Sequence, residues 1–255
     1  MKLRLGVWNA EWARSGSEKG DAIEKLLKDE AFDFVCLTEA YGDLLSSNGY
    51  TISSEPDYGY PIRLGRRKVV LWSRRPWTHV DDVGSDTLPS GRFVCGTTSS
   101  PIGAVRVVGV CVPWRGAHVT TGRKNRRPWE DHAQYLQGLT SFLRELPDAE
   151  STILAGDFNQ RIPRARAPRS VFDALATALN RFHVATSGLV QPIGSHVIDH
   201  VAHGRNLVTI NVTGWSGTRS DGLRMSDHDG VCVELGIRPS QRIDKVFGDR
   251  RGFHF

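Results

Sequence analysis

Short apolar runs that lead into a polar residue recur along this chain of 255 residues. The run over 3–9 ends in Asn9, and the run over 151–155 leads into Asp157. Such runs are typical of buried β-strands, and polar side chains at strand ends can converge above a sheet while the strand bodies form the core beneath it. The pattern therefore predicts a layered α/β fold with its functional groups gathered at one edge.

The spacing of the apolar residues predicts more strand than helix. Strands are expected at 3–9, 32–37, 68–73, 92–98, 104–112, 151–155, 197–202, 207–213 and 230–237. Helices are expected at 17–30, at 129–146 and in a segment that Ser170 would cap. Because we find no repeat and no long linker, we expect a single domain over 1–238. Residues 239–255 lose periodicity and are expected to form a surface tail, with a partner-binding segment as the alternative.

Composition narrows the class of partner and compartment. The net charge of +5 is carried mostly by arginine and favours an anionic partner such as nucleic acid. Each of the four cysteines stands alone inside an apolar run, which is typical of reduced core thiols. The chain starts on a strand pattern without a signal peptide, and no segment has the length of a membrane span. We therefore expect a cytoplasmic protein; the sequence leaves protein partners unknown.

Carboxylates near the predicted strand ends suit a hard divalent cation. Mg²⁺ prefers oxygen ligands, usually one or two carboxylates together with water and substrate phosphate. Glu39 is the best such ligand, and Glu11 and Asp227 are expected in the same role. A cation held there, Mg²⁺ or Mn²⁺, would neutralise phosphate oxygens and stabilise a leaving oxyanion.

The remaining polar residues suit hydrolysis of a phosphoester. Asp157 is placed to take a proton from an attacking water, and the uncharged Asn159 and Asn9 can hold that base or the phosphate. His228 paired with Asp199 would form a carboxylate-held imidazolium facing the developing negative charge. Taken singly, each residue also has a structural interpretation. Residues 157–159, for example, could form an Asx turn.

Five separated motifs together resemble the endonuclease/exonuclease/phosphatase superfamily, which includes deoxyribonuclease I, exonuclease III-like nucleases and inositol polyphosphate phosphatases. The motifs are Asn9, Leu37-Thr38-Glu39, Gly156-Asp157-Phe158-Asn159, Ile198-Asp199-His200 and Ser226-Asp227-His228. They follow the family's order over nearly the whole chain. The resemblance implies a four-layer α/β sandwich, with two mixed sheets face to face and helices outside. It also implies that Glu39 is the principal metal ligand, that Asp157 activates water and that Asp199 and His228 form the supporting dyad.

One position departs from the family pattern. Many relatives carry Tyr or His near the end of the strand before the long helix, where this chain has Cys111. A cysteine makes a poor hydrogen bond to phosphate, so we expect Arg115, His118 or Lys124 to substitute, or the activity to be slower. Trp114 stands where abasic-site endonucleases carry Asn, which argues against a dedicated abasic-site repair role.

Two basic loops are expected to border the catalytic face and bind substrate. Their candidate residues are Arg115, Arg123, Lys124, Arg126 and Arg127 in the first loop, and Arg161 and Arg164 in the second. Clustered arginines favour a phosphate backbone through counterion release, although a solvated surface has the same composition. Trp114 and Trp129 flank the first loop and could stack bases, although Trp129 is expected to pack inward.

The sequence predicts a metal-dependent phosphodiesterase, foremost a nuclease for DNA or RNA. A phosphatase of a small or lipid phosphoester would use the same central residues. An inactive anion-binding module is the third alternative, supported mainly by Cys111.

Overall fold

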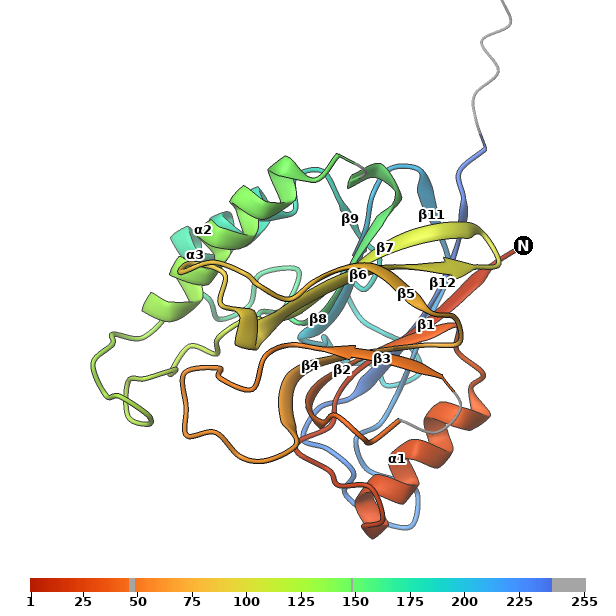
Figure 1. Cartoon of the computed structure of the whole chain (residues 1–255), viewed down its shortest axis with the longest axis horizontal. Coiled ribbons are helices and arrows are strands. Elements are labelled where there is room, and N and C mark those ends of the chain that lie inside the picture. The colour runs from red at the N-terminus through yellow and green to blue at the C-terminus, as the bar shows by residue number, and fades with distance from the viewer. Residues whose placement is uncertain (46–48, 148, 240–255) are drawn as a thin grey trace, which may run out of the picture.

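The computed structural model describes residues 1–45, 49–147 and 149–239, which form two six-stranded sheets and three α-helices. The strands are β1 Leu3–Asn9, β2 Phe34–Tyr41, β3 Tyr50–Ser53, β4 Arg66–Ser73, β5 Trp77–Asp81, β6 Phe93–Ser100, β7 Gly103–Cys111, β8 Thr152–Asp157, β9 His183–Val184, β10 Asp199–His203, β11 Leu207–Trp215 and β12 Gly230–Ile237. The helices are α1 Glu18–Asp29, α2 Glu130–Glu145 and α3 Arg169–Ala178. Figure 1 shows the sheets stacked on each other, with α1 outside one and α2 and α3 outside the other. The predicted α/β sandwich is confirmed.

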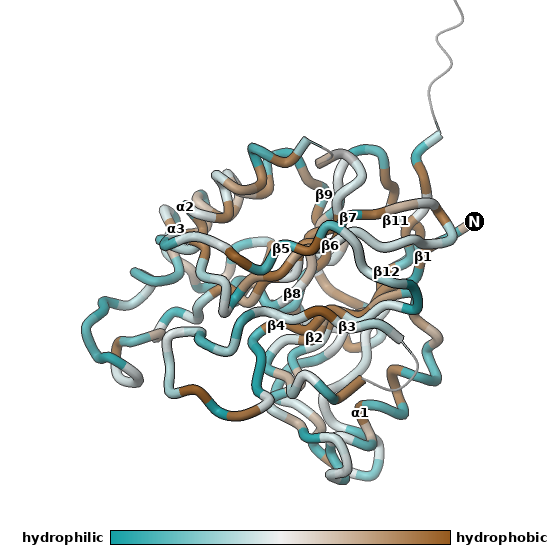
Figure 2. Tube along the Cα trace, viewed as in Figure 1, coloured by the Kyte–Doolittle hydropathy of each residue, from teal (hydrophilic) through white to brown (hydrophobic). Residues whose placement is uncertain are grey.

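Apolar side chains fill all three spaces between the layers. Val7, Cys36 and Leu71 of one sheet meet Val107 and Ile153 of the other in the central cluster. Two further clusters join the outer faces of the sheets to the helices. In Figure 2 the hydrophobic colour concentrates in the strands, whereas many of the loops are hydrophilic. The core therefore lies beneath the loops that carry the polar motifs.

Strand pairing fixes where the polar motifs lie. The first sheet has the order β11-β12-β1-β2-β4-β3, and the second has the order β5-β6-β7-β8-β10-β9. Within the second sheet, β7 and β8 are parallel with Cys111 beside Asp157, and β10 is antiparallel to β8 with Asp199 opposite Asp157. In the first sheet Asn9, the last residue of β1, pairs with Thr38 of the parallel strand β2. These registers bring chemistry-bearing residues of both sheets to the same end of the sandwich.

Most predicted elements are present, with differences at their bounds. The strand predicted over 32–37 begins at Phe34 and continues to Tyr41, so Glu39 lies within it. Ser170 does not cap α3; Pro168 holds the N-cap position, and Ser170 lies in the first helical turn. The helix therefore starts at Arg169, earlier than predicted, and its N-cap residue makes no side-chain capping hydrogen bond.

The prediction omitted the strands β3, β5 and β9. Each is the outermost strand at an end of its sheet, and β9 has only two residues. Edge strands bury little of their surface, so their sequences lack the apolar periodicity from which strands are recognised.

The predicted surface tail falls, apart from residue 239, outside the described residues. None of the helices in the described part is both long and apolar enough to cross a membrane.

Candidate active site

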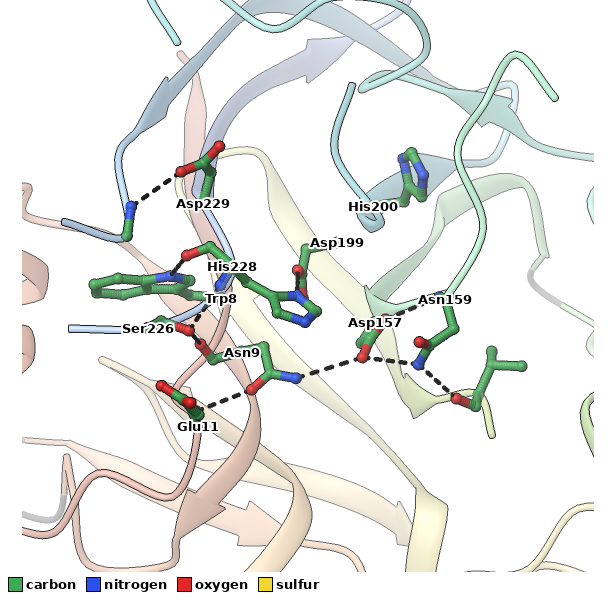
Figure 3. A network of polar contacts seen from close by, with 12 residues as sticks. Trp8, Asn9, Glu11, Asp157, Asn159, Asp199, His200, Ser226, His228 and Asp229 are labelled. Carbon is green, nitrogen blue, oxygen red and sulfur yellow. Dashed lines mark hydrogen bonds and ion pairs between the residues drawn. The ribbon is translucent and has the colours of Figure 1, made fainter. Parts of the chain in front are cut away.

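Asp157 ends β8 and is almost completely buried, with 2% of its surface exposed. Its Oδ1 accepts the amide hydrogen of Asn159 at 2.8 Å, which is an Asx turn, and its Oδ2 accepts from Asn159 Nδ2 at 2.9 Å. Asn9 Nδ2 approaches the same Oδ2 at 3.4 Å from the other sheet (Figure 3). The turn interpretation of the sequence is therefore right. The same hydrogen bonds hold the buried carboxylate in a fixed orientation.

Gly156 allows this turn to form close to the neighbouring strand. Its φ is +138°, and a Cβ atom placed there would lie 1.9 Å from the carbonyl oxygen of Val110. A side chain does not fit at that separation, so steric exclusion explains why this position of the motif is glycine.

His228 and Asp199 form the predicted pair. His228 Nδ1 lies 2.5 Å from Asp199 Oδ2, and Asp199 is 1% exposed. Figure 3 shows His228, Asp157 and Asn9 converging from different elements. Among the described residues, Asp157, Asp199 and His228 form a group whose ligand-type atoms all lie within 4.8 Å of one another.

Two residues that sequence reasoning missed fix the position of His228. Trp8 Nε1 donates to the carbonyl oxygen of His228 at 2.9 Å. Ser226 Oγ donates to the carbonyl oxygen of Asn9 at 2.6 Å and accepts the amide hydrogen of His228 at 3.1 Å. Their adjacency to Asn9 and His228 in the chain was the available signal, because residues next to a functional side chain often hold its backbone.

The charges of this group shift one another's protonation. Burial raises the pKa of Asp157 to about 7, assisted by the neighbouring charge of Asp199 and opposed by that of His228. Burial alone would lower the pKa of His228, but the carboxylate of Asp199, with smaller effects from Asp157 and Asp227, raises it to about 10. His228 is therefore an imidazolium at neutral pH, whereas Asp157 can exchange a proton there.

Two of the three carboxylates predicted to bind metal, Glu39 and Glu11, have cationic partners. Glu39 Oε1 is 2.6 Å from Lys68 Nζ, and Glu11 is 2.8 Å from Lys19 Nζ and 3.1 Å from Arg224 Nη2. Asp227 is exposed beside His228. The structure does not bring these three carboxylates into one tight cluster within the described part of the chain.

The donor set nevertheless fits a hard divalent cation. A protonated His228 has no free lone pair for a metal, which leaves the oxygen atoms of Asp157 and of the surrounding carboxylates. The pKa of Asp157 is raised by burial and, in part, by the nearby charges of Asp199 and Glu39. Asp199 Oδ1 is buried and has no hydrogen-bond partner among the residues that the structure describes. A cation would offset this excess of negative charge.

Left-handed backbone conformations gather at the same edge. Glu11, Trp12, Glu39 and Asn159 have φ values of 44°, 59°, 47° and 51°. Non-glycine residues rarely adopt this region, and such conformations cluster at functional sites where surrounding contacts enforce them. Here the amide of Trp12 donates to the carbonyl oxygen of Glu39 at 2.7 Å, joining two of these residues.

The basic loops border two separate cavities. A cavity of about 310 Å³ opens at Asn159 and is lined by Trp114, Trp129, Arg115 and Arg161. Trp114 is 43% exposed, and Trp129 lines the cavity although it was expected to pack inward. This cavity combines aromatic side chains with guanidinium groups directly beside the turn of Asp157 and Asn159.

The other predicted substrate-binding residues lie elsewhere. Arg123 and Arg126 line a larger cavity of about 570 Å³, where Arg126 Nε is 2.6 Å from Asp131. Lys124 and Arg127 are exposed, and Arg164 donates to the carbonyl oxygen of Ala167 at 3.0 Å. The two loops therefore do not form one continuous basic track.

Cys111 is buried. Within the described part of the chain it makes no hydrogen bond with Arg115, His118 or Lys124, the residues expected to supply the phosphate hydrogen bond in its place. Burial raises the pKa of its thiol to about 12, and the charges that also act on it belong to Lys68, Asp157, Arg92 and Glu39. Arg115 and Lys124 are exposed, and His118 stacks on Tyr60 at 4.4 Å between ring centroids. The thiol is therefore neutral at physiological pH, which makes it a poor nucleophile.

Comparisons with known proteins agree with this fold. A model of the Endonuclease/Exonuclease/phosphatase family matches residues 6–228. A search of curated proteins finds no match. The structure of a 3'-5' exonuclease, NExo from Neisseria meningitidis, gives a TM-score of 0.69 at 18% identity and covers 92% of this chain and 100% of that chain.

Two further structures contain nucleic acid. One is described as the 3' phosphatase NExo from Neisseria bound to a product DNA hairpin, with a TM-score of 0.68, 17% identity and coverage of 91% of this chain and 98% of that chain. The other is D. rerio TDP2 complexed with a single-strand DNA product, with a TM-score of 0.61, 12% identity and coverage of 92% and 99%. At these identities the similarity establishes the fold.

Proposed function

The chain belongs to the endonuclease/exonuclease/phosphatase family, and from this premise we propose that it is a divalent-metal-dependent phosphodiesterase, foremost a nuclease acting on DNA or RNA. Members of this family are phosphoric-ester hydrolases. The observation that carries the choice of nuclease is the cavity of Trp114, Trp129, Arg115 and Arg161 that opens at Asn159.

In the proposed reaction Asp157 accepts a proton from the attacking water. Asn159 and Asn9 hold the carboxylate in line through the hydrogen bonds to Oδ2. As the water oxygen bonds to phosphorus and the ester P–O bond breaks, the imidazolium of His228 stabilises the negative charge on the phosphoryl oxygens, and Asp199 keeps that ring oriented and protonated. No covalent intermediate is required.

Glu39, with Glu11 and Asp227 as further oxygen donors, would hold Mg²⁺ or Mn²⁺. The chemistry supplied there is neutralisation of the non-bridging oxygens and of the leaving oxyanion. Both Glu39 and Glu11 form ion pairs with lysine in the structure. To bind the metal, each carboxylate would give up part of its contact with that lysine.

The cavity supports a nucleic acid substrate for two reasons. Trp114 presents an exposed ring, and base stacking on an aromatic side chain contributes about 1–3 kcal/mol for each base. Arg115 and Arg161 on the same wall suit the adjacent phosphates. The similar NExo and TDP2 structures contain DNA products, which points to the same substrate class.

A phosphatase is the second candidate. NExo is described both as a 3'-5' exonuclease and as a 3' phosphatase, so one fold of this family accommodates both reactions. For this chain a 3'-phosphorylated nucleic acid end would use the same cavity.

We assign the protein to the cytoplasm. The support is chemical: Cys36, Cys95, Cys111 and Cys232 are all free and buried, as in proteins of reducing compartments.

The test is a panel of end-labelled single- and double-stranded DNA and RNA, with and without 3'-phosphates, incubated in Mg²⁺ or Mn²⁺. Asp157→Asn is the inactive variant, and Asp173→Asn on the exposed face of α3 is the matched control. We expect metal-dependent cleavage of internucleotide bonds that Asp157→Asn loses and Asp173→Asn retains. Removal of terminal phosphates alone would favour the phosphatase. Tight binding without turnover in every lane would favour the inactive binding module.

A further inference from the structure

We propose that Lys68 is a catalytic residue whose ammonium group contacts a non-bridging oxygen of the scissile phosphate. It would supply the phosphate contact that Cys111 cannot make. This inference rests on the proposed phosphoesterase function and assigns a substrate-binding role within it.

Lys68 is a charged residue in an unusually buried position. It lies on β4 and is 8% exposed, although lysine is rarely buried without a functional or structural partner. The structure gives its ammonium one hydrogen-bond acceptor among the described residues, Glu39 Oε1 at 2.6 Å. An ammonium group has three protons, so two remain for a ligand that enters the site.

Two aromatic rings hold the ammonium group in place. Lys68 Nζ lies 5.2 Å from the ring centroid of Trp12 and 5.3 Å from that of Tyr58. These two rings stack on each other with centroids 5.8 Å apart. Cation–π contacts of this kind restrict a flexible lysine without using its hydrogen-bond donors. The ammonium group is therefore pre-positioned rather than free on a long side chain.

The surroundings of Cys111 connect Lys68 to the catalytic turn. Cys111 is beside Asp157 in the parallel register of β7 and β8. Lys68 is paired with Glu39, and its charge and that of Arg92 lower the pKa of the Cys111 thiol, whereas the charges of Asp157 and Glu39 raise it. The thiol itself stays protonated and is only a weak donor. Two cations act on this position: Arg92 Nη1 donates to the carbonyl oxygen of Cys111 at 3.3 Å, whereas Lys68 is held by Glu39 and has donors left for a ligand.

A compact ammonium charge suits phosphate. Lysine binds phosphoryl oxygens as a point charge, and stabilisation of the charge that develops in the transition state is commonly the largest contribution to catalysis. The rival explanation is that Lys68 serves only as the counterion of Glu39. The two explanations predict opposite effects when the charge is removed.

The first experiment compares Lys68→Met with Lys2→Met. Lys2 is a matched control because its Nζ makes a similar ion pair, 2.9 Å from Glu234 Oε1, away from the site. With bis(p-nitrophenyl) phosphate in Mg²⁺, we expect Lys68→Met to reduce kcat by about 100-fold, the effect of losing one oxyanion donor, and Lys2→Met to leave it unchanged. Circular dichroism and thermal unfolding establish that both variants are folded.

The second experiment uses Lys68→Ala and added alkylamines. If the ammonium group contacts phosphate, ethylamine or propylamine should restore activity by about 10-fold or more with saturation, whereas a structural role would give no rescue by amines. The proposal is overturned if Lys68→Met is as active as the wild type. It is also overturned if Lys68→Met is more active and reaches half-activation at lower Mg²⁺, which would identify Lys68 as only the counterion of Glu39.

A third readout does not depend on turnover. Binding of a labelled single-stranded DNA is measured in EDTA at several salt concentrations. Loss of one phosphate contact in Lys68→Met should reduce the slope of log K against log salt by about 0.7, the value expected for one contact to a single strand. An unchanged slope would contradict the proposal. If the wild type hydrolyses no substrate, the proposed function fails, but this slope still decides whether Lys68 contacts phosphate.

Discussion

Asp199 lies directly opposite Asp157 in the antiparallel register of β8 and β10, and Asp199 Oδ2 forms a hydrogen bond with Nδ1 of His228. Two buried carboxylates on neighbouring strands would repel each other if both were ionised without compensation. The imidazolium of His228 provides that compensation, and this explains why the pKa shifts of Asp157 and His228 are linked. The geometry couples the proposed base, Asp157, to His228, the group proposed to stabilise charge.

The dyad should behave as one unit. Asp199→Asn and His228→Gln are each expected to reduce kcat/KM by about 100- to 1,000-fold, because the imidazolium then loses its charge or is removed. The double variant should be no worse than the more impaired single variant, since residues that act together are not additive. His79→Gln on the exposed strand β5 is the control. Additive losses would show that the two residues act separately.

Activity should rise with pH as Asp157 loses its proton. A general base acts only when ionised, and burial raises the pKa of Asp157 to about 7. A bound cation favours the carboxylate, so the acid limb of kcat/KM should lie at or below about pH 7. The measurement is a pH–rate profile with bis(p-nitrophenyl) phosphate. A rate that increases toward low pH would contradict the assignment of Asp157 as the base.

Binding of a divalent cation should depend on Glu39. We expect Mn²⁺ to raise the unfolding temperature of the wild-type protein and to bind by calorimetry, because a ligand that binds only the native state stabilises it. Glu39→Gln should weaken Mn²⁺ binding by about 10-fold or more. The control is Glu234→Gln, which removes the carboxylate of the Lys2–Glu234 ion pair away from the site. It should bind Mn²⁺ as the wild type does. Equal affinities in all three proteins would remove Glu39 from the site.

The cavity beside Asn159 should determine the affinity for nucleic acid and should have little effect on the rate of the chemical step. Trp114→Ala and Arg161→Ala are expected to raise KM for an oligonucleotide by about 10-fold, consistent with the loss of one stacked base or one phosphate contact. Hydrolysis of bis(p-nitrophenyl) phosphate should change less than about twofold, because that small ester does not need the cavity. Arg144→Ala on α2 is the control. Equal losses on both substrates would place these residues in the chemical step instead.

The sequence predicted the architecture well because buried strands have a strong apolar signature. It placed Asn9, Asp157 and Asp199 at strand ends, and the registers of β1, β8 and β10 bring them together. The edge strands β3, β5 and β9 were missed, since partly exposed strands of two to five residues carry little pattern.

Sequence reasoning did not detect contacts that only tertiary structure creates. Lys68 lies within an apolar strand and appears as one more basic residue in Arg66-Arg67-Lys68, yet it is the one beside Glu39. The anchoring of His228 by Trp8 joins residues 220 positions apart. Strand pairing brings these residues together: β2 pairs with β4, which places Lys68 beside Glu39, and β1 pairs with β12, the strand that follows His228.

The decisive experiment measures hydrolysis of bis(p-nitrophenyl) phosphate by the wild type and by Asp157→Asn, each in Mg²⁺ and in EDTA. It asks whether the protein is a metal-dependent phosphodiesterase that uses Asp157 as its base. It depends on the catalytic group alone, not on recognition of a particular nucleic acid. We predict turnover only by the wild type in Mg²⁺, with Asp157→Asn reduced by at least about 1,000-fold while remaining folded. Equal turnover by the two proteins, or undiminished wild-type turnover in EDTA, would contradict the account.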